Sequence, residues 1–259
     1  MNLDLTGKRA VVCGSTQGIG KASAIELALM GADVTLIARD EQKLKSVIQE
    51  LGGKGKHTYL VCRLLLEKTK KQKITEFAAT NAIHILVNNT GGPPGGQAID
   101  AQPEEFVKAF SSHLLCNHIL VQAVVPSMKK EKFGRIINII STSVKIPIRG
   151  LGVSNTTRGA VANWSKTLSL ELAPFGITVN NVLPGATMTG RLEQIINNNA
   201  QKNDKTFDEA KADMIREIPA GRISEAHEVA AAVAFLASPA AGYINGVNIP
   251  VDGGRTGSL

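Results

Sequence analysis

The chain has few aromatic residues and no long apolar run, and each absence excludes a class of protein. Aromatic residues make up 4% of the 259 positions, and basic residues cluster only locally, as in KTKKQK at 68–73. Proteins that bind single-stranded nucleic acid combine basic grooves with aromatic stacking platforms, so we expect no nucleic-acid partner. No stretch approaches the roughly 20 consecutive apolar residues that a membrane span requires, so we expect no membrane insertion.

Cysteine is also scarce. The three cysteines, Cys13, Cys62 and Cys116, are widely separated and lie in apolar stretches. Their odd number and spacing fit neither a disulfide framework nor a metal knuckle, so we interpret them as reduced core residues and expect no metal site. The first residues, MNLDLTGKRAVVCG, lead directly into a strand pattern without the features of a signal peptide. We therefore expect a cytoplasmic protein. The net charge of +7 favours phosphate-bearing ligands or an acidic partner, or reflects only a solvated surface.

Apolar runs alternate with longer amphipathic stretches along the whole chain, from RAVVC at 9–13 to VNIPVDGG at 247–254. Continuously apolar strands separated by helices are typical of parallel sheets covered on both faces. With no linker or composition break, the pattern predicts one domain over 1–259, an α/β Rossmann-like doubly wound parallel sheet with helices on both faces. The long amphipathic segment from Pro103 to Met128 belongs to this pattern. A polar stretch at about 187–221 is either a substrate lid or a surface excursion.

A glycine-rich turn, CGSTQGIG at 13–20, follows the first apolar run and precedes an amphipathic stretch. Glycine at such a turn lets the backbone approach a pyrophosphate at a helix N-terminus, where free N–H groups favour an anion. The alternative is a tightly packed turn without a ligand. The candidate cofactor-binding residues of this turn are Gly14, Ser15, Gln17, Gly18, Ile19 and Gly20.

The second apolar run ends in TLIARD, which places Arg39 where many dinucleotide folds read the ribose. An acidic residue at this position favours NAD, whereas arginine suits the 2′-phosphate of NADP. Asp40 lies one residue further along the chain, so it is less well placed than Arg39 to contact the ribose. The sequence thus favours NADP(H) as cofactor, with an exposed loop charge as the alternative interpretation of Arg39.

Further motifs follow in order: NNTG at 88–91, GRIINIIS at 134–141, VNNVLPG at 179–185 followed by Thr189, and YINGVNIPVDGG at 243–254. Together with the glycine turn they resemble the short-chain dehydrogenase/reductase family, and most of all its 3-oxoacyl-acyl-carrier-protein reductases. The resemblance implies a small-molecule carbonyl or acyl thioester substrate, acyl carrier protein as a candidate partner, and a homodimer or homotetramer. It adds to the cofactor site Asn89, Gly91, Pro184, Gly185, Thr187 and Thr189.

The catalytic residues that the resemblance implies are largely replaced. The family uses a serine, an asparagine, and a tyrosine with a lysine four residues later. Ser141 matches the serine, but Ser154 stands at the tyrosine, Arg158 at the lysine and His113 at the asparagine. The chain contains no Y-x-x-x-K motif, and its tyrosines, Tyr59 and Tyr243, lie elsewhere.

These replacements change how a proton can be delivered. An aliphatic hydroxyl is a far weaker acid than a phenol, so Ser154 cannot simply replace the tyrosine. Arg158 can hold ribose hydroxyls and supply positive charge, but a permanently protonated group cannot join a proton relay. His113, with an ordinary pKa near 6.5, is the candidate proton donor. The alternative for His113 is a polar helix residue bonded to a backbone carbonyl.

Three functions are consistent with this pattern. The favoured one is an NADPH-dependent reductase of a ketone or 3-oxoacyl thioester, with Ser141 orienting the carbonyl and His113 or water as acid. The second is a catalytically degenerate NADP(H)-binding protein that serves as a sensor or non-catalytic subunit. The third is a non-redox enzyme that uses the same pocket, and no sequence feature supports it.

Arg63 stands where the family usually has an aspartate beside the adenine, and either stacks on adenine or blocks its pocket.

Overall fold

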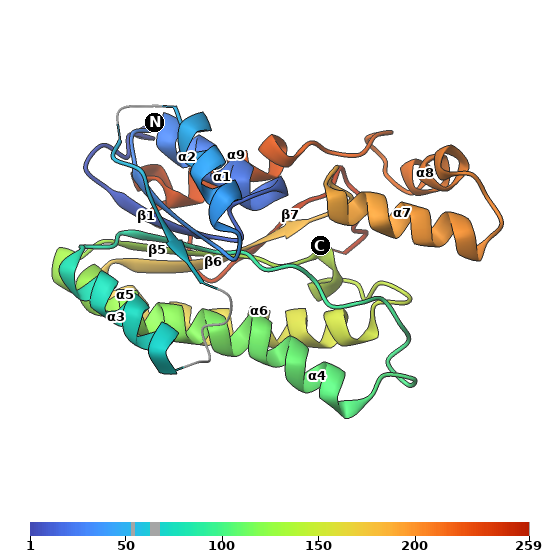
Figure 1. The fold of residues 1–259 in the computed structure, drawn as a ribbon, viewed down its shortest axis with the longest axis horizontal. Coiled ribbons are helices and arrows are strands. Elements are labelled where there is room, and N and C mark those ends of the chain that lie inside the picture. Colours follow the sequence, from blue (N-terminus) through green and yellow to red (C-terminus); the bar gives the residue numbers. More distant parts are fainter. Residues whose placement is uncertain (53–54, 63–67, 259) are drawn as a thin grey trace.

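The centre of the molecule is a seven-stranded sheet in which all pairings are parallel (Figure 1). The computed structural model describes residues 1–52, 55–62 and 68–258, and the strand order within them is β3-β2-β1-β4-β5-β6-β7. The strands are β1 (Arg9–Cys13), β2 (Asp33–Ala38), β3 (Thr58–Val61), β4 (Ile85–Asn88), β5 (Gly134–Ile139), β6 (Ile177–Pro184) and β7 (Asn248–Val251).

Helices cover both faces of this sheet. They are α1 (Gly18–Leu29), α2 (Glu41–Glu50), α3 (Lys68–Thr80), α4 (Pro103–Phe110), α5 (Cys116–Glu131), α6 (Gly152–Leu172), α7 (Gly190–Lys202), α8 (Phe207–Arg216) and α9 (Ala226–Ala237). In Figure 1, α1, α2 and α9 lie on one face, and α3, α4, α5 and α6 lie on the other. The prediction of a single α/β domain with a doubly wound parallel sheet is therefore confirmed.

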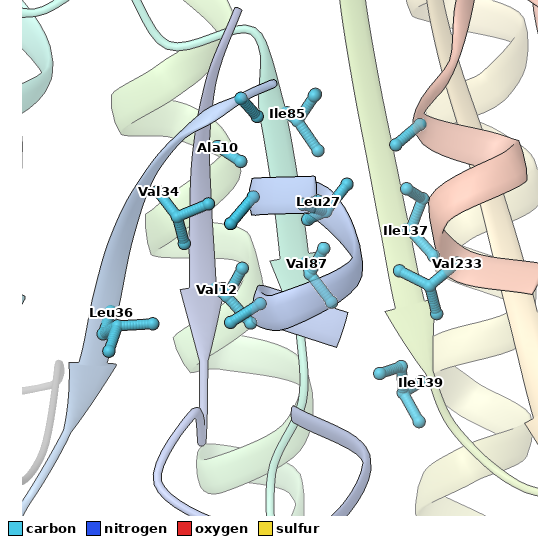
Figure 2. Packing of buried hydrophobic residues seen from close by; sticks show 14 of the residues in the cluster. Ala10, Val12, Leu27, Val34, Leu36, Ile85, Val87, Ile137, Ile139 and Val233 are labelled. Atoms are coloured by element: carbon cyan, nitrogen blue, oxygen red, sulfur yellow. The ribbon is translucent and has the colours of Figure 1, made fainter. Parts of the chain in front are cut away.

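Two hydrophobic cores flank the sheet, because successive residues of a strand point to opposite faces. Val12 of β1 packs with Val34, Leu27 and Val233 in the core beneath α1 and α9 (Figure 2). The next residue towards the N-terminus, Val11, belongs to the core beneath α3 and α5. Both faces need apolar residues, which explains why the strands are continuously apolar instead of alternating.

Four asparagines form a ladder across the sheet on β4, β5, β6 and β7. The amide nitrogen of Asn88 donates to Oδ1 of Asn138 at 2.8 Å, and that of Asn138 donates to Oδ1 of Asn181 at 3.0 Å. Asn181 continues the ladder with a 2.8 Å bond to Oδ1 of Asn248. These residues face one another in the strand register. The first three are buried, so each depends on its neighbour for the hydrogen bonds that water would otherwise provide.

The polar stretch at 187–221 folds as two helices, α7 and α8, with a small hydrophobic core of their own. That core contains Leu192, Ile196, Ala200, Ala210 and Ile218. Thr206 begins α8 with a capping box, in which its hydroxyl accepts from the backbone of Glu209 and the Glu209 carboxylate accepts from the backbone of Thr206. The stretch is therefore an ordered helical pair beside the carboxyl edge of the sheet (Figure 1).

None of the described helices is both long enough and apolar enough to cross a bilayer.

Candidate functional site at the carboxyl edge of the sheet

The parallel strands all end at one edge of the sheet, where the predicted site residues meet. The strand order reverses at β1, which lies between β2 and β4. In open α/β sheets the ligand crevice lies at such a reversal, outside the carboxyl ends of the strands. The glycine turn follows β1, Arg39 follows β2, Asn89 follows β4 and Ser141 lies just beyond β5. The fold thus brings together residues that are far apart in the sequence.

The three glycines of the turn occupy positions that have no room for a side chain. Gly14 and Gly18 have φ of +59° and +54°, in the left-handed region that favours glycine. A Cβ on Gly20 would lie 2.3 Å from the carbonyl oxygen of Gly14 and 2.5 Å from Nδ2 of Asn89. Nδ2 of Asn89 also donates to that carbonyl at 3.3 Å. The turn is therefore held against the end of β4, with the free N–H groups of α1 at its exit.

The non-glycine residues of the turn contribute differently. The Ser15 side chain is fully buried and its hydroxyl donates to the carbonyl of Ile37 at 3.4 Å. Ile19 packs against the core beneath α1. Gln17 is exposed and precedes α1 without capping it through its side chain. Ser15 and Ile19 consequently offer a ligand only their backbone atoms, which the sequence pattern alone did not reveal.

Arg39 and Asp40 have separate roles after β2. The Asp40 carboxylate accepts from the backbone N–H of Lys43 at 3.1 Å and so caps α2. Arg39 is exposed and forms no ion pair with a residue that the structure describes. This leaves the guanidinium available to a ligand, whereas Asp40 is engaged. The predicted adenine neighbour, Arg63, lies outside the described residues.

The two candidate serines lie on neighbouring elements. Ser141 follows β5, and its hydroxyl oxygen accepts from the backbone N–H of Ser143 at 3.1 Å, which opens a short 3₁₀ turn at Thr142–Val144. Ser154 lies half-buried in the first turn of α6. Asn155 beside it holds the preceding loop, since its side-chain amide bonds both the carbonyl and the N–H of Ile148. The loop between β5 and α6 is thereby fixed next to both hydroxyls.

His113 lies on a π-helical turn, Ser111–Leu115, that joins α4 to α5 within the long amphipathic segment from Pro103 to Met128. Such turns often mark functional positions. The imidazole is 2% exposed, and its Nδ1 shares a 2.5 Å hydrogen bond with the hydroxyl of Thr90. Burial, and secondarily the charge of Arg158, lowers the pKa of His113 to about 3. The imidazole is therefore neutral near pH 7, which argues against the expected role of His113 as a cationic proton donor.

Arg158 occupies the same corner. Its side chain is 7% exposed, and it donates to the carbonyl of Ile139 at 3.1 Å and to that of Thr90 at 3.4 Å. Burial, followed by the charge of Arg191, lowers its pKa to about 10. Arg158 thus remains protonated near neutral pH, and Thr90 links it to His113. The site therefore carries a buried, permanent positive charge at the position of the family's lysine.

Arg191 is a site residue that the sequence did not reveal. It lies in the first turn of α7, and its Nη2 donates to the carbonyl of Pro93 at 2.7 Å. A Cβ built on Gly92 would lie 3.9 Å from Nη2 of both Arg158 and Arg191. Within the predicted polar stretch nothing distinguished this arginine from other surface charges. Its approach to Arg158 depends on how α7 lies over the loop after β4.

The turn after β6 is built from short contacts. A Cβ on Gly185, next to Pro184, would lie 2.8 Å from Cα of Asp252. The Thr187 hydroxyl is buried and accepts from Ser224, while the Thr189 hydroxyl accepts from the backbone of Leu192 and caps α7. Thr189 also lies against Gly18 of the glycine turn.

Gly91, in the loop after β4, is exposed and has open space where a side chain would be.

These residues fit NADP(H). The glycine turn leaves a cradle that a Cβ at Gly20 would fill, and the N-terminus of α1 supplies donors for a pyrophosphate. Arg39 is an exposed cation that pairs with no described carboxylate, and it lies at the end of β2, where a ribose 2′-phosphate binds in this type of fold. The sheet, the glycine turn and the polar carboxyl edge together define a Rossmann-type α/β protein with a dinucleotide site.

Comparison with known proteins gives the family. A family model described as enoyl-(acyl carrier protein) reductase matches residues 14–256. The 3-oxoacyl-[acyl-carrier-protein] reductase FabG of Haemophilus influenzae is 37% identical over 255 residues, covering 96% of this chain and 98% of the relative. The chain therefore belongs to the short-chain dehydrogenase/reductase family.

Solved structures agree with this assignment. YwfH, an NADPH-dependent reductase involved in bacilysin biosynthesis, superposes with a TM-score of 0.91 at 30% identity, covering 97% of this chain and 99% of that one. L-Sorbose reductase from Gluconobacter frateurii, solved with NADPH and L-sorbose, has a TM-score of 0.91 at 26% identity and full coverage of both chains. The relatives are NAD(P)H-dependent oxidoreductases.

Proposed function

We propose that this chain is an NADPH-dependent reductase of a ketone or a 3-oxoacyl thioester that works without the family's tyrosine and lysine. The observation that carries the proposal is the candidate nucleotide site: a turn whose glycine positions leave no space for a side chain, held by Asn89, with Arg39 exposed at the end of β2 and without an ion pair to a described residue. Relatives named as 3-oxoacyl-[acyl-carrier-protein] and NADPH-dependent reductases support the reaction class. Acyl carrier protein is a candidate carrier of a thioester substrate.

The chain's own residues would act on the substrate oxygen. NADPH, when bound, supplies a hydride. Ser141 donates a hydrogen bond to the carbonyl oxygen and orients it, and Arg158 places a positive charge near the negative charge that develops there. Positioning and electrostatic stabilisation of this kind contribute more to many reactions than a general acid, which supplies about 10²- to 10⁴-fold.

Water is the proton donor that the electrostatics favour. The pKa of His113 near 3 leaves too little imidazolium for proton donation at neutral pH. Ser154 is half-buried and, as an alcohol, is a weak acid. His113 instead holds the Thr90 hydroxyl, whose backbone carbonyl accepts from Arg158, and so acts as a positioning residue. We further propose that α7 and α8 form the substrate lid, since Thr189, which caps α7, lies against Gly18 of the glycine turn.

A fluorescence titration with NADPH and, in parallel, NADH tests the first requirement. Saturable binding with preference for NADPH is expected, and binding of neither nucleotide would reject the proposal. NADPH oxidation is then followed with acetoacetyl and crotonyl thioesters, acetoacetate and simple ketones, so that 3-oxo and enoyl reduction are distinguished. Turnover that Ser141→Ala lowers by about 10-fold or more is expected if the serine orients the carbonyl.

The second candidate function is a non-catalytic NADP(H)-binding subunit. The observation that favours it is the replacement of the phenol and the amine by Ser154 and Arg158, together with the lowered pKa of His113. It predicts NADPH binding without oxidation by any carbonyl in the panel. Steady turnover by the purified chain would exclude it.

A further inference from the structure

The carboxyl edge of the sheet holds two guanidinium groups with no counter-charge between them. Arg158 and Arg191 come from α6 and α7, and their Nη2 atoms lie equally close to the position that a side chain on Gly92 would fill. Neither arginine forms an ion pair with any carboxylate in the described part of the chain. Two like charges close together repel, and after burial the charge of Arg191 is the second cause that lowers the pKa of Arg158.

Arg158 has unused hydrogen-bonding capacity. A guanidinium offers five N–H donors in a planar fork. Arg158 uses two nitrogens on backbone carbonyls, and its buried Nε has no partner among the described residues. A buried charge that lacks both a counter-ion and full hydrogen bonding is destabilising. A bound anion would supply the counter-charge and a hydrogen-bond acceptor that Arg158 lacks among the described residues.

The position of Arg191 is also unfavourable for the stability of α7. It lies in the first turn of α7, where the helix dipole favours acidic side chains and disfavours cations. The same N-terminal end favours a bound anion. Its Nη2 is held by the carbonyl of Pro93, which fixes the guanidinium over the loop that carries Gly92. Gly92 leaves open the space between the two arginines.

We propose that Arg158 and Arg191 together bind a carboxylate on the substrate, which makes the substrate a keto acid instead of a neutral ketone or thioester. Two arginine forks match the two oxygens of a carboxylate. Such binding neutralises the repulsion between the cations. It also fixes the substrate between α6 and the first turn of α7. The inference rests on the proposed reductase function, narrows its ketone substrate to one that carries a carboxylate, and excludes the thioester alternative.

Binding of acetoacetate and of its uncharged methyl ester to the protein saturated with NADP⁺ tests the proposal. Oxidised nucleotide cannot reduce the ketone, so isothermal titration calorimetry measures affinity without turnover. Acetoacetate is expected to bind about 10- to 100-fold more tightly than the ester, as charge-assisted hydrogen bonds imply. Arg191→Gln is expected to abolish that preference, whereas Lys202→Gln, which removes the same charge from the other end of α7, retains it.

A second readout follows Arg158 directly. Its Nε–H resonance, identified by its loss in Arg158→Lys, is expected to shift in ¹H–¹⁵N spectra on addition of acetoacetate and not of the ester. Absence of a shift, or equal affinity for acid and ester in the wild type, would overturn the proposal.

The phosphates of the nucleotide are the other anions that could bind here. An Arg191→Gln variant that weakens NADP⁺ and leaves the preference for acetoacetate unchanged would assign the arginines to the nucleotide and reject the proposal. NADP⁺ affinity is therefore measured for each variant first. Loss of all nucleotide binding in the wild type would reject the reductase function, and the acid-to-ester comparison on the free protein would still test the carboxylate site.

Discussion

Arg39 and Asp40 are adjacent in the sequence, but only one of them is available to a ligand. The Asp40 carboxylate caps the N-terminus of α2, whereas Arg39 is exposed and forms no ion pair with a described residue. In the proposed reductase, the choice between NADPH and NADH would therefore depend on Arg39, an exposed cation without an ion pair to a described residue. A residue of this kind can be replaced without loss of the fold.

Replacing Arg39 by alanine tests this role. Arg39→Ala is expected to weaken NADPH binding by about 10- to 100-fold, because one charge-assisted contact to the 2′-phosphate is lost, and to leave NADH binding unchanged. Lys43→Ala is the matched control, since it removes an exposed positive charge four residues later. Fluorescence titration gives both affinities. An equal loss for the two nucleotides would contradict 2′-phosphate recognition.

His113 should make stability depend on pH. In the folded protein its pKa is about 3, whereas an unfolded histidine titrates near its ordinary value of about 6.5. Between these values the unfolded state binds more protons, so the free energy of unfolding falls as the pH falls. The folded state therefore has its full stability with respect to His113 above about pH 6.5, and it loses stability progressively as the pH falls towards 3.

The substitution His113→Asn removes this contribution and restores the residue that the family carries. Urea unfolding at about pH 7 and about pH 5 is expected to show a loss about 2 kcal/mol greater in the wild type than in the variant. The same loss in both proteins would mean that His113 is not buried as a neutral ring.

At the scale of elements, the glycine turn and α1 form one unit. Gly20→Ala places a methyl group against the Gly14 carbonyl and the Asn89 amide, so the turn must move away from β4. NADPH affinity is expected to fall by more than about 10-fold, since the donors at a helix N-terminus act only over short distances.

Gly159→Ala is the matched control for that change. Gly159 lies inside α6 with open space around its Cβ position, so alanine is expected to stabilise the protein by about 0.5–1 kcal/mol. Thermal unfolding measures stability, and titration measures NADPH binding. Unchanged NADPH affinity in Gly20→Ala would show that the turn does not form the nucleotide cradle.

The sequence predicted the strands well because both faces of the sheet are covered and each strand is continuously apolar. It did not predict α7 and α8, because their composition is polar and their core is small, although the T-x-x-E capping box at Thr206 and Glu209 was a usable signal. Motifs located Ser141 and Arg39. Arg191 required the folded structure, since its partner at Pro93 is distant in the sequence.

At the scale of the whole molecule, an apolar face on α4, the π-helical turn and α6 remains uncovered. Val107 is 65% exposed, and Phe110 and Leu115 line a groove of about 380 Å³ beside it. Exposed apolar patches of this kind mark interaction surfaces. We propose that a second copy of this chain covers the face, in agreement with the homo-oligomer that the family resemblance implies.

Light scattering during gel filtration tests the oligomer. Val107→Glu is expected to shift the protein to a smaller species, because a charge at the centre of an apolar contact must be desolvated on association. Leu29→Glu, at an exposed leucine at the end of α1, is expected to leave the assembly unchanged. A monomeric wild type, or the same mass for both variants and the wild type, would contradict the proposal.

The asparagine ladder has a direction. The three bonds run in one direction, since each amide nitrogen donates towards β7. At the other end of the ladder, Oδ1 of Asn88 has no hydrogen-bond partner among the described residues, and Asn88 immediately precedes the residue that holds the glycine turn. Hydrogen bonds aligned head to tail polarise one another, and their strengths are cooperative. Truncating Asn248 on the outer strand should therefore weaken the Asn88–Asn138 bond two strands away. Such weakening would mean that β7, at the far edge of the sheet, is energetically coupled to β4 beside the candidate nucleotide site.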